Sequence, residues 1–213
     1  MFAEFVDGPF WYFSATVFVI GVVLRLFFAL RIGSTTPLSK PRGSASKGAI
    51  RAVFSRFVPR REFGSRMRLE VIAGYAFHVG LFALLFFAAP HIEFYRERIL
   101  GFGWTPMPHW AFYIASQLAF AGLLVLWLRR MLHPVSRMLS DAGDHIGSIL
   151  VFVVMLTGCL ALAESHESLR IIHLFLAELL LIYFPFSSLM HTFTFVFSRG
   201  YLGANLARHG VKA

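Results

Sequence analysis

The chain of 213 residues has a single cysteine, Cys159, which lies inside an apolar run. One cysteine excludes a disulfide framework, a thiolate cluster and a C-x-x-C motif. Any iron–sulfur chemistry must therefore belong to a partner protein. Charge is also scarce, because Asp, Glu, Lys and Arg together make up only 15% of the residues. That share lies well below the value of an ordinary soluble domain.

The N-terminal segment lacks the features of a secretory signal peptide. It carries Glu4 and Asp7 but no base, and it has no small-residue cleavage site. A signal peptide would have a basic segment before its apolar core. We therefore expect an uncleaved first helix whose N-terminus lies outside.

Apolar residues, by contrast, make up 57% of the chain, and the mean hydropathy is +0.68. Runs of about twenty apolar residues recur, which is the length of a transmembrane helix. The sequence predicts an all-α polytopic membrane protein, a bundle of five transmembrane helices. The expected spans are residues 9–30, 69–89, 110–128, 145–163 and 173–197.

The distribution of bases predicts the topology. Segments 31–68, 129–137 and 199–213 hold 16 of the 20 Lys and Arg residues, whereas the alternate segments hold Arg96, Arg98 and Arg170. Cytoplasmic loops carry such an excess, so we expect the C-terminus inside. The net charge of +9 then reflects topology and anionic lipid, and it does not require a nucleic-acid partner.

The basic loop 31–68 contains a short helical pattern. Ile50, Val53, Phe54 and Phe57 follow i, i+3, i+4, i+7 spacing, and Arg51 falls off that stripe. This spacing predicts an amphipathic helix near 49–58 that lies on an anionic leaflet. A nucleic-acid-binding arm is the less favoured alternative.

The fifth predicted span contains two histidines, His173 and His191, in an otherwise apolar run. Eighteen residues are five helical turns, so on one straight helix both rings leave the same face, about 27 Å apart. That separation approaches the thickness of a bilayer core. The rings are either ligands of two stacked cofactors or interfacial polar residues at the ends of a span.

The predicted topology sorts four histidines into two pairs by depth. His78 and His191 lie near the inner face, and His91 and His173 lie near the outer face. Two imidazoles from facing helices are the ligands that a b-type haem takes in a membrane bundle. The sequence therefore predicts two haem b groups bound by these four residues.

His91 is the less certain ligand. On a straight helix it lies about 220° around from His78, and Pro90 must end or kink the helix to redirect it. His109 and His166 are alternative outer ligands. Small residues can let the macrocycle approach the backbone (Gly74, Gly80, Gly158). Bases near the inner site can pair with haem propionates or be ordinary bases of the inside loops (Arg66, Arg68, Arg199). Three further histidines are expected at the surface (His133, His145, His209).

One acidic residue, Glu178, lies inside the fifth span, five residues after His173. An ionisable group in a membrane is costly, and it is a functional candidate by default. We expect a role in proton relay or quinone binding, with a polar side chain satisfied by a neighbour as the alternative.

These residues carry a resemblance to a known family. His173, the run Phe-Pro-Phe-Ser at 184–187, and His191 resemble the corresponding helix of the gamma subunit of respiratory nitrate reductase. The chain is also similar to the cytochrome b subunits of heterodisulfide-reductase-type and sulfite-reductase-associated complexes. Residues 77–80 resemble the family's first ligand in the second span, and 137–150 resemble the loop that enters the fourth helix. The nitrate reductase subunits have a second histidine ten residues after the first, where this chain has Ala88, whereas shorter relatives have a Pro-His at the place of Pro90-His91.

The resemblance covers most of the chain, and it implies a function. It implies two b haems, quinol oxidation near the outer haem, and electron passage inward to a cytoplasmic iron–sulfur subunit of a respiratory complex. It also implies the cytoplasmic (inner) membrane of a bacterium or archaeon. The chain would then be catalytic only within its complex, as an electron-transfer subunit.

Three alternatives stay open at this stage. The chain can be a mono-haem variant, a haem-free membrane anchor for a soluble redox complex, or a subunit in which electrons flow toward quinone. A transporter is disfavoured because it predicts an internal repeat, and five spans do not divide evenly.

Overall fold

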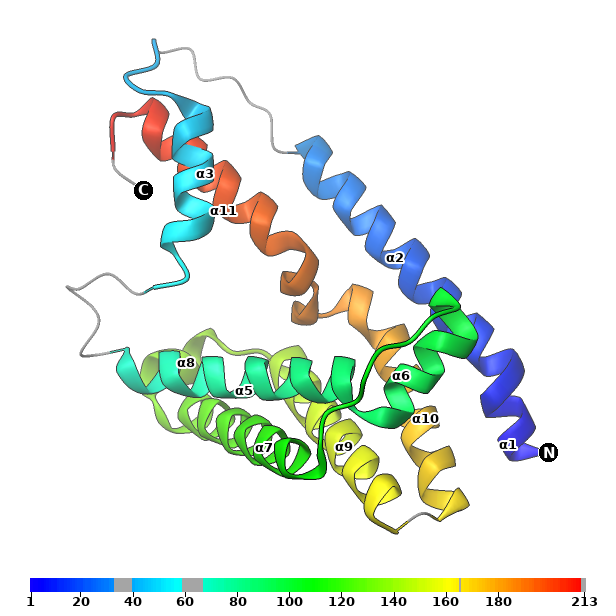
Figure 1. The fold of residues 1–213 in the computed structure, drawn as a ribbon. Coiled ribbons are helices and arrows are strands. Elements are labelled where there is room, and N and C mark those ends of the chain that lie inside the picture. Colours follow the sequence, from blue (N-terminus) through cyan, green and yellow to red (C-terminus); the bar gives the residue numbers. More distant parts are fainter. Residues whose placement is uncertain (33–39, 59–66, 165, 212–213) are drawn as a thin grey trace. The chain divides into compact units, whose positions relative to one another are not determined.

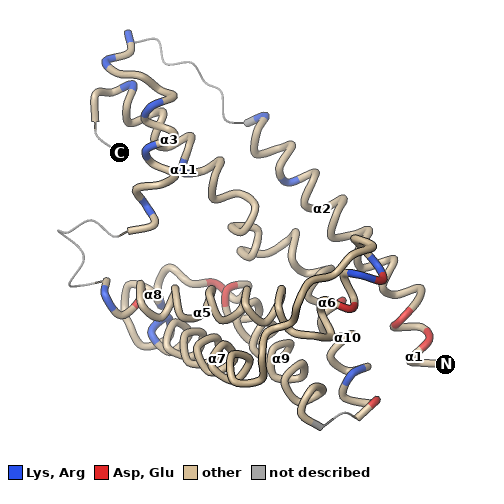
Figure 2. Tube along the Cα trace, in the orientation of Figure 1, with Lys and Arg blue, Asp and Glu red and all other residues tan. Residues whose placement is uncertain are grey.

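The computed structural model describes residues 1–32, 40–58, 67–164 and 166–211. Within these residues the chain is helical, without a strand, and five helices are long and apolar enough to cross a membrane. This confirms the predicted all-α architecture with five membrane-spanning helices. The five spans run over Phe2–Arg31, Arg68–Phe87, His109–Leu132, Ala142–Ala163 and Glu167–Phe186. Charged residues gather near the ends of these helices (Figure 2).

Contacts divide the chain into two units, and each is described here by itself. One unit holds residues 1–62 and 149–213, and the other holds residues 63–148. Helix α9 (Ala142–Glu164) crosses the boundary between them. Parts of the predicted basic loop, residues 33–39 and 59–66 with Arg66 among them, lie outside the described residues.

In the first unit, the N-terminal helices pack along α10 (Glu167–Tyr183), and both run in the same direction (Figure 1). They are α1 (Phe2–Phe5), a π-helical turn (Val6–Phe10) that contains Pro9, and α2 (Trp11–Ile32). Phe10 meets Phe175, and further along Phe18 meets Phe184. The helical segment therefore begins before residue 9, where the hydropathy pattern placed the start of the first span.

The expectation of one straight helix over 173–197 is wrong. Helix α10 ends at Tyr183, and two short 3₁₀ turns (Phe184–Phe186 and Ser188–Met190) precede α11 (His191–Arg208). Pro185 causes the interruption, because proline has no N–H to donate and its ring clashes with the preceding turn. His173 and His191 therefore belong to different helices, and the five-turn spacing does not relate them.

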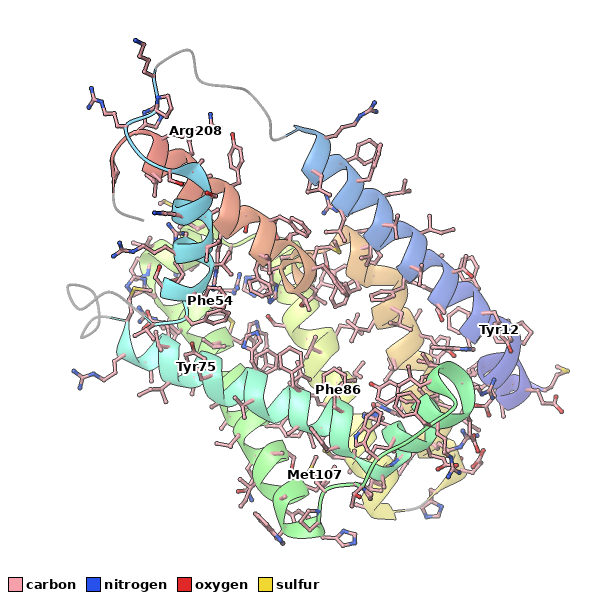
Figure 3. The ribbon with its side chains drawn as sticks, turned by 45° about the horizontal axis from the view of Figure 1, so that its top comes forward. Tyr12, Phe54, Tyr75, Phe86, Met107 and Arg208 are labelled. Carbon is pink, nitrogen blue, oxygen red and sulfur yellow. The ribbon has the colours of Figure 1, made fainter. Side chains whose placement is uncertain are left out.

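The predicted basic loop contains α3 (Ala45–Ser55), which packs against α11. The contact uses small residues, because added Cβ atoms at Gly48 and Gly203 would collide with the facing helix. Two larger apolar residues of α3 are exposed instead: Ile50 is 62% exposed, and Phe54, labelled in Figure 3, is 69% exposed. Helix α3 therefore presents apolar and basic side chains on its exposed surface.

In the second unit, α5 (Arg68–Phe87) and α7 (His109–Leu132) form a close antiparallel pair. A Cβ at Gly122 would lie 2.6 Å from the carbonyl oxygen of Ala73, and a Cβ at Gly80 would lie 2.7 Å from the backbone nitrogen of Ala119. Small residues let membrane helices approach in this way. Short helices α6 (Ala89–Tyr95) and α8 (Pro134–Leu139) complete the unit.

Candidate functional site

His78 lies in the middle of α5. Its Nδ1 lies 2.7 Å from the carbonyl oxygen of Gly74, one turn earlier. The rings of Phe77 and Phe82 flank the imidazole at 4.8 and 6.2 Å. The hydrogen bond to Gly74 and the aromatic neighbours thus help to orient the ring.

His91 is redirected by the end of α5. The helix stops at Phe87, Ala88 is extended, and Pro90 lies in the first turn of α6. The His91 ring folds back, so that Nδ1 lies 3.0 Å from the Leu84 carbonyl oxygen and 3.1 Å from that of Leu85. Leu85 is two turns after His78 and therefore on the same face. The end of α5 at Phe87 thus lets the His91 ring fold back toward the face of α5 that carries His78 and Leu85.

Burial favours the neutral form of the His91 imidazole. It lowers the pKa of His91, and the hydrogen bonds to the two carbonyl groups offset part of that effect. A neutral imidazole is the form that binds a metal.

Two aromatic side chains bind backbone carbonyl groups at the end of α5. The Tyr95 hydroxyl donates to the Leu85 carbonyl (3.2 Å), and the Trp104 indole donates to the Phe86 carbonyl (2.7 Å). The backbone N–H of Met107 satisfies the Phe87 carbonyl (2.9 Å). All four carbonyls of the last turn therefore have donors, although such groups have no partner within a helix. Trp104 caps this helix and stacks on Tyr95 with ring centroids 5.8 Å apart.

His173 lies in α10 and packs against α9. Its Nδ1 is 3.1 Å from the Val154 carbonyl oxygen and 3.4 Å from the Thr157 hydroxyl. A Cβ at Gly158 would come within 2.9 Å of the ring's Cε1. Gly158 therefore leaves room for the imidazole, and the space that it opens is taken by His173.

His191 is the first residue of α11 and directly follows the break. Its Nδ1 lies 2.8 Å from the Ser188 carbonyl oxygen. Ser187 stabilises the break from within, since its hydroxyl donates to the Phe184 carbonyl (2.9 Å) and accepts from the Leu189 N–H (3.2 Å). The Phe-Pro-Phe-Ser run thus makes a defined bend that ends at the histidine.

The four predicted ligands share one arrangement. Each has Nδ1 at hydrogen-bond distance from a backbone carbonyl oxygen. A carbonyl only accepts, so the proton must be on Nδ1, and the lone pair of the neutral ring is then on Nε2. Metal-ligating histidines usually donate their other ring N–H in this way, which fixes the tautomer and the ring orientation.

Other histidines differ from this arrangement. The Nδ1 of His145 accepts from the Trp127 indole at 3.1 Å, which places the proton on Nε2. The Nδ1 of His133 is buried and has no hydrogen-bond partner among the described residues. His109 and His166 make no side-chain hydrogen bond within the described parts of the chain.

The donor set fits a haem better than a bare metal ion. In the described part of the chain, no three His, Cys, Asp or Glu side chains gather into a metal-binding group. A haem needs only axial ligands from the protein, because the macrocycle supplies the other four nitrogens. Of the glycines suggested for its slot, Gly80 contacts α7 and Gly158 contacts His173, whereas a Cβ at Gly74 would meet nothing within 4 Å.

Glu178 lies deep in the contact between α10 and the N-terminal helices. It is 4% exposed, and its Oε2 has no hydrogen-bond partner among the described residues. Two turns earlier on α10, Arg170 forms an ion pair with Asp7 at 2.8 Å and another with Glu167. The buried Ser14 of α2 donates to the Trp11 carbonyl. The carboxyl group of Glu178 is thus enclosed, with one oxygen that lacks a hydrogen-bond partner among the described residues, two turns from the ion pairs of Arg170.

The sequence interpretation missed Arg25. It is the only charged residue between Phe10 and Leu30, and that isolation within an apolar run was the available signal. Its Nε donates to the Pro185 carbonyl oxygen at 3.0 Å. Of the bases suggested for propionates, Arg199 packs on the rings of Phe57 and Phe195 instead.

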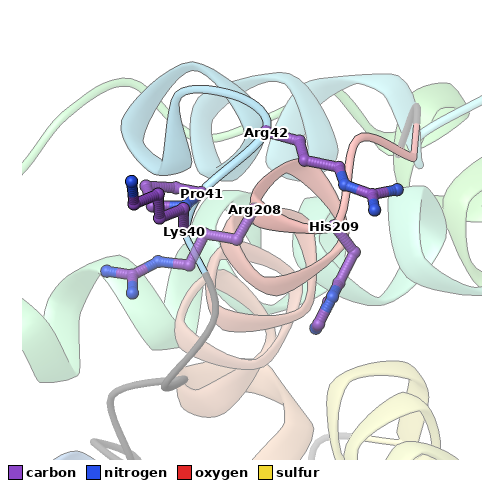
Figure 4. A pocket seen from close by; sticks show the side chains of 5 residues that line it. All are labelled: Lys40, Pro41, Arg42, Arg208 and His209. Carbon is purple, nitrogen blue, oxygen red and sulfur yellow. The ribbon is translucent and has the colours of Figure 1, made fainter.

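A basic cleft lies where α3 and α11 meet in the first unit. Its volume is about 510 Å³, and the backbone N–H of Arg42 donates to the Arg208 carbonyl at 2.8 Å beside it. Residues 40–58 and 191–211 include no acid. The residues that line the cleft are Lys40, Pro41, Arg42, Arg208 and His209 (Figure 4).

Comparisons with known proteins place the chain among membrane redox subunits only coarsely. No family model matches it. It is 28% identical over 211 residues to a protein of Nitratidesulfovibrio vulgaris, a match that covers 95% of this chain and 92% of that protein. It is 25% identical over 249 aligned positions to the Hdr-like menaquinol oxidoreductase cytochrome b-like subunit of Archaeoglobus fulgidus, covering 84% of this chain and 74% of the relative.

Proposed function

We propose that this chain is a di-haem b membrane subunit of a respiratory oxidoreductase. It transfers electrons between the quinone pool and an iron–sulfur partner on the cytoplasmic side. The observation that carries the proposal is the Nδ1-to-carbonyl hydrogen bond at all four predicted ligands. The name of the Archaeoglobus fulgidus relative supports the quinol-linked redox role.

The ligand assignment follows the depth of each histidine in the predicted topology. His78 and His191 bind the inner haem, and His91 and His173 bind the outer haem. When bound, the two haem b groups would supply one-electron transfer between the outer and the inner site. The chain's own contribution is to hold each imidazole as the Nδ1–H tautomer, with Nε2 as the ligating atom.

The proposed orientation of the chain in the membrane rests on the distribution of Lys and Arg residues among its loops. The N-terminus lies outside and the C-terminus inside, in the cytoplasmic membrane of a bacterium or archaeon. This topology places α3 and the end of α11 in the cytoplasm, where positive residues gather.

The quinone side is the outer half of the chain. Glu178 is suited to accept a proton from a quinol, because its Oε2 is enclosed and lacks a hydrogen-bond partner among the described residues. A second cleft of about 510 Å³, whose lining includes Trp104, Glu93 and Arg96, is a further candidate for the quinone head group.

The partner side is the pair of helices α3 and α11. Their described residues carry bases and no acid, and the cleft between Arg42 and Arg208 adds a concave surface. An acidic face of an iron–sulfur subunit complements this charge, which steers association and fixes its register. The exposed Ile50 and Phe54 add apolar contact area.

The test is to add a menaquinol analogue to the purified, oxidised chain and to follow the visible absorption. We expect b-type α-band absorption to appear within the mixing period. A coloured protein that quinol does not reduce would contradict the quinone role. A colourless protein would support the haem-free anchor.

A further inference from the structure

The break between α10 and α11 creates a problem for a chain in a membrane. Backbone groups without partners are costly in hydrocarbon, so an interrupted helix needs other donors and acceptors. Within the break, the Ser187 side chain and the His191 ring bind the carbonyls of Phe184 and Ser188. The Pro185 carbonyl takes its donor from outside the segment.

That donor is Arg25 of α2. Its Nε lies 3.0 Å from the Pro185 carbonyl oxygen, across 160 residues of sequence. One turn before Arg25, a Cβ at Gly21 would overlap the Pro185 ring. Phe18 of the same helix meets Phe184, the first residue of the break, and Phe193, just after it, at 5.4 and 6.0 Å. Helix α2 therefore holds the break with a glycine, an aromatic ring and a cation.

Arg25 and His191 bind carbonyls that are three residues apart, those of Pro185 and Ser188. The bend that Arg25 fixes is therefore the bend that sets the direction of the His191 ring. The guanidinium also keeps a full positive charge beside this segment, since arginine does not lose its proton in proteins. A neutral donor of similar reach would provide the hydrogen bond without the charge.

We propose that Arg25 is the positioning residue of the inner haem site and its electrostatic partner. This inference rests on the proposed function, because it takes His191 as an inner haem ligand. The Nε hydrogen bond fixes the orientation of the His191 ring, and the charge favours the reduced state of the haem bound there. Burial, charge and hydrogen bonds around a ligand are the means by which a protein tunes haem potential.

The experiment compares three variants in the full chain by redox titration and by EPR of the oxidised haems. Arg25→Gln removes the charge, Arg25→Lys keeps the charge but removes the planar Nε donor, and Gly21→Ala pushes on Pro185 while leaving Arg25 in place. Arg31→Gln is the matched control, since Arg31 lies on the same helix and packs on Phe27. The His191→Ala variant identifies the signals of the inner haem.

We expect Arg25→Gln to lower the midpoint potential of the inner haem and to leave the outer haem unchanged. Arg25→Lys should keep the potential near the wild-type value and shift the low-field g value, which reports the orientation of the ligand rings. Gly21→Ala should shift the same g value with little change in potential. Arg31→Gln should alter neither quantity.

The inference is overturned if Arg25→Gln binds both haems with wild-type potentials and g values. Arg25 would then be an interfacial anchor of α2. Should Arg25→Gln fail to insert, unchanged g values in both Arg25→Lys and Gly21→Ala would equally overturn it. A wild-type chain without haem would instead refute the proposed function itself, so the two failures are distinguishable.

Discussion

The imidazole of His173 lies directly against Gly158. A Cβ at position 158 would come within 2.9 Å of the ring's Cε1 and 3.2 Å of its Nδ1. The ring cannot retreat easily, because Nδ1 is also hydrogen-bonded to the Val154 carbonyl on the same helix. Gly158 of α9 thus determines how closely His173, the predicted outer ligand on α10, can approach α9.

Gly158→Ala should displace the His173 ring and weaken the outer haem. Changes around a metal ligand typically lower affinity about 10- to 100-fold, so we expect about half the wild-type haem after purification. Haem content per chain measures this directly. Gly200→Ala is the control, since its Cβ would meet only Val53 at 3.9 Å. Full haem content in Gly158→Ala would argue against His173 as a ligand.

His91→Ala should remove the outer haem, whereas His109→Ala and His166→Ala should keep it. The structure favours His91 because Nδ1 of His91 is within 3.0 Å of the Leu84 carbonyl, which leaves the lone pair on Nε2. Haem content and the reduced-minus-oxidised spectrum of the three variants provide the measurement. Loss of haem in His109→Ala with none in His91→Ala would reverse the assignment.

The architecture was readable from the sequence because apolar runs and the spacing of bases are local signals. The interruption at Pro185 was not predicted, although Phe-Pro-Phe-Ser was noted, because the five-turn spacing of His173 and His191 suggested a continuous helix. The redirection of His91 by Pro90 was foreseen as a possibility. The hydrogen bonds of the His91 Nδ1 could not be predicted, because they depend on which backbone carbonyl groups at the end of α5 lie within its reach.

The roles of single residues were harder to predict than the spans. Gly80 and Gly158 were both candidates for a haem slot, but one contacts α7 and the other contacts His173. Sequence spacing gives the face of a residue on its own helix and does not say which helix covers that face. The sequence singles out Arg25 as an isolated charge but does not show its partner, which is 160 residues away.

Glu178→Gln should slow quinol oxidation and leave haem content unchanged. A positioned proton acceptor typically contributes at least about 100-fold to a rate, so we expect a loss of about that size in haem reduction by a menaquinol analogue. Stopped-flow absorption gives the rate. Glu167→Gln is the matched control, because Glu167 is an exposed partner of Arg170. Equal rates in Glu178→Gln and wild type would exclude the proton role.

Gly122→Val should destabilise the contact between α5 and α7. The added side chain would meet the backbone of Ala73 and Phe77, which cannot move aside as a flexible side chain does. Overpacking typically costs about 1–3 kcal/mol, so the unfolding temperature in detergent should fall by several degrees. Gly8→Ala should have no such effect, since nothing lies within 4 Å of a Cβ there. An unchanged melting temperature in Gly122→Val would contradict the close crossing.

The central claim is that His78, His91, His173 and His191 hold two b haems, and the most direct test is the number of haems per chain. A pyridine haemochrome assay on the purified protein, referred to its concentration by amino-acid analysis, measures that number. The account predicts two haem b groups per chain, falling to one in His91→Ala and in His191→Ala. A wild-type protein with no haem, or haem content unaffected by either substitution, would contradict it.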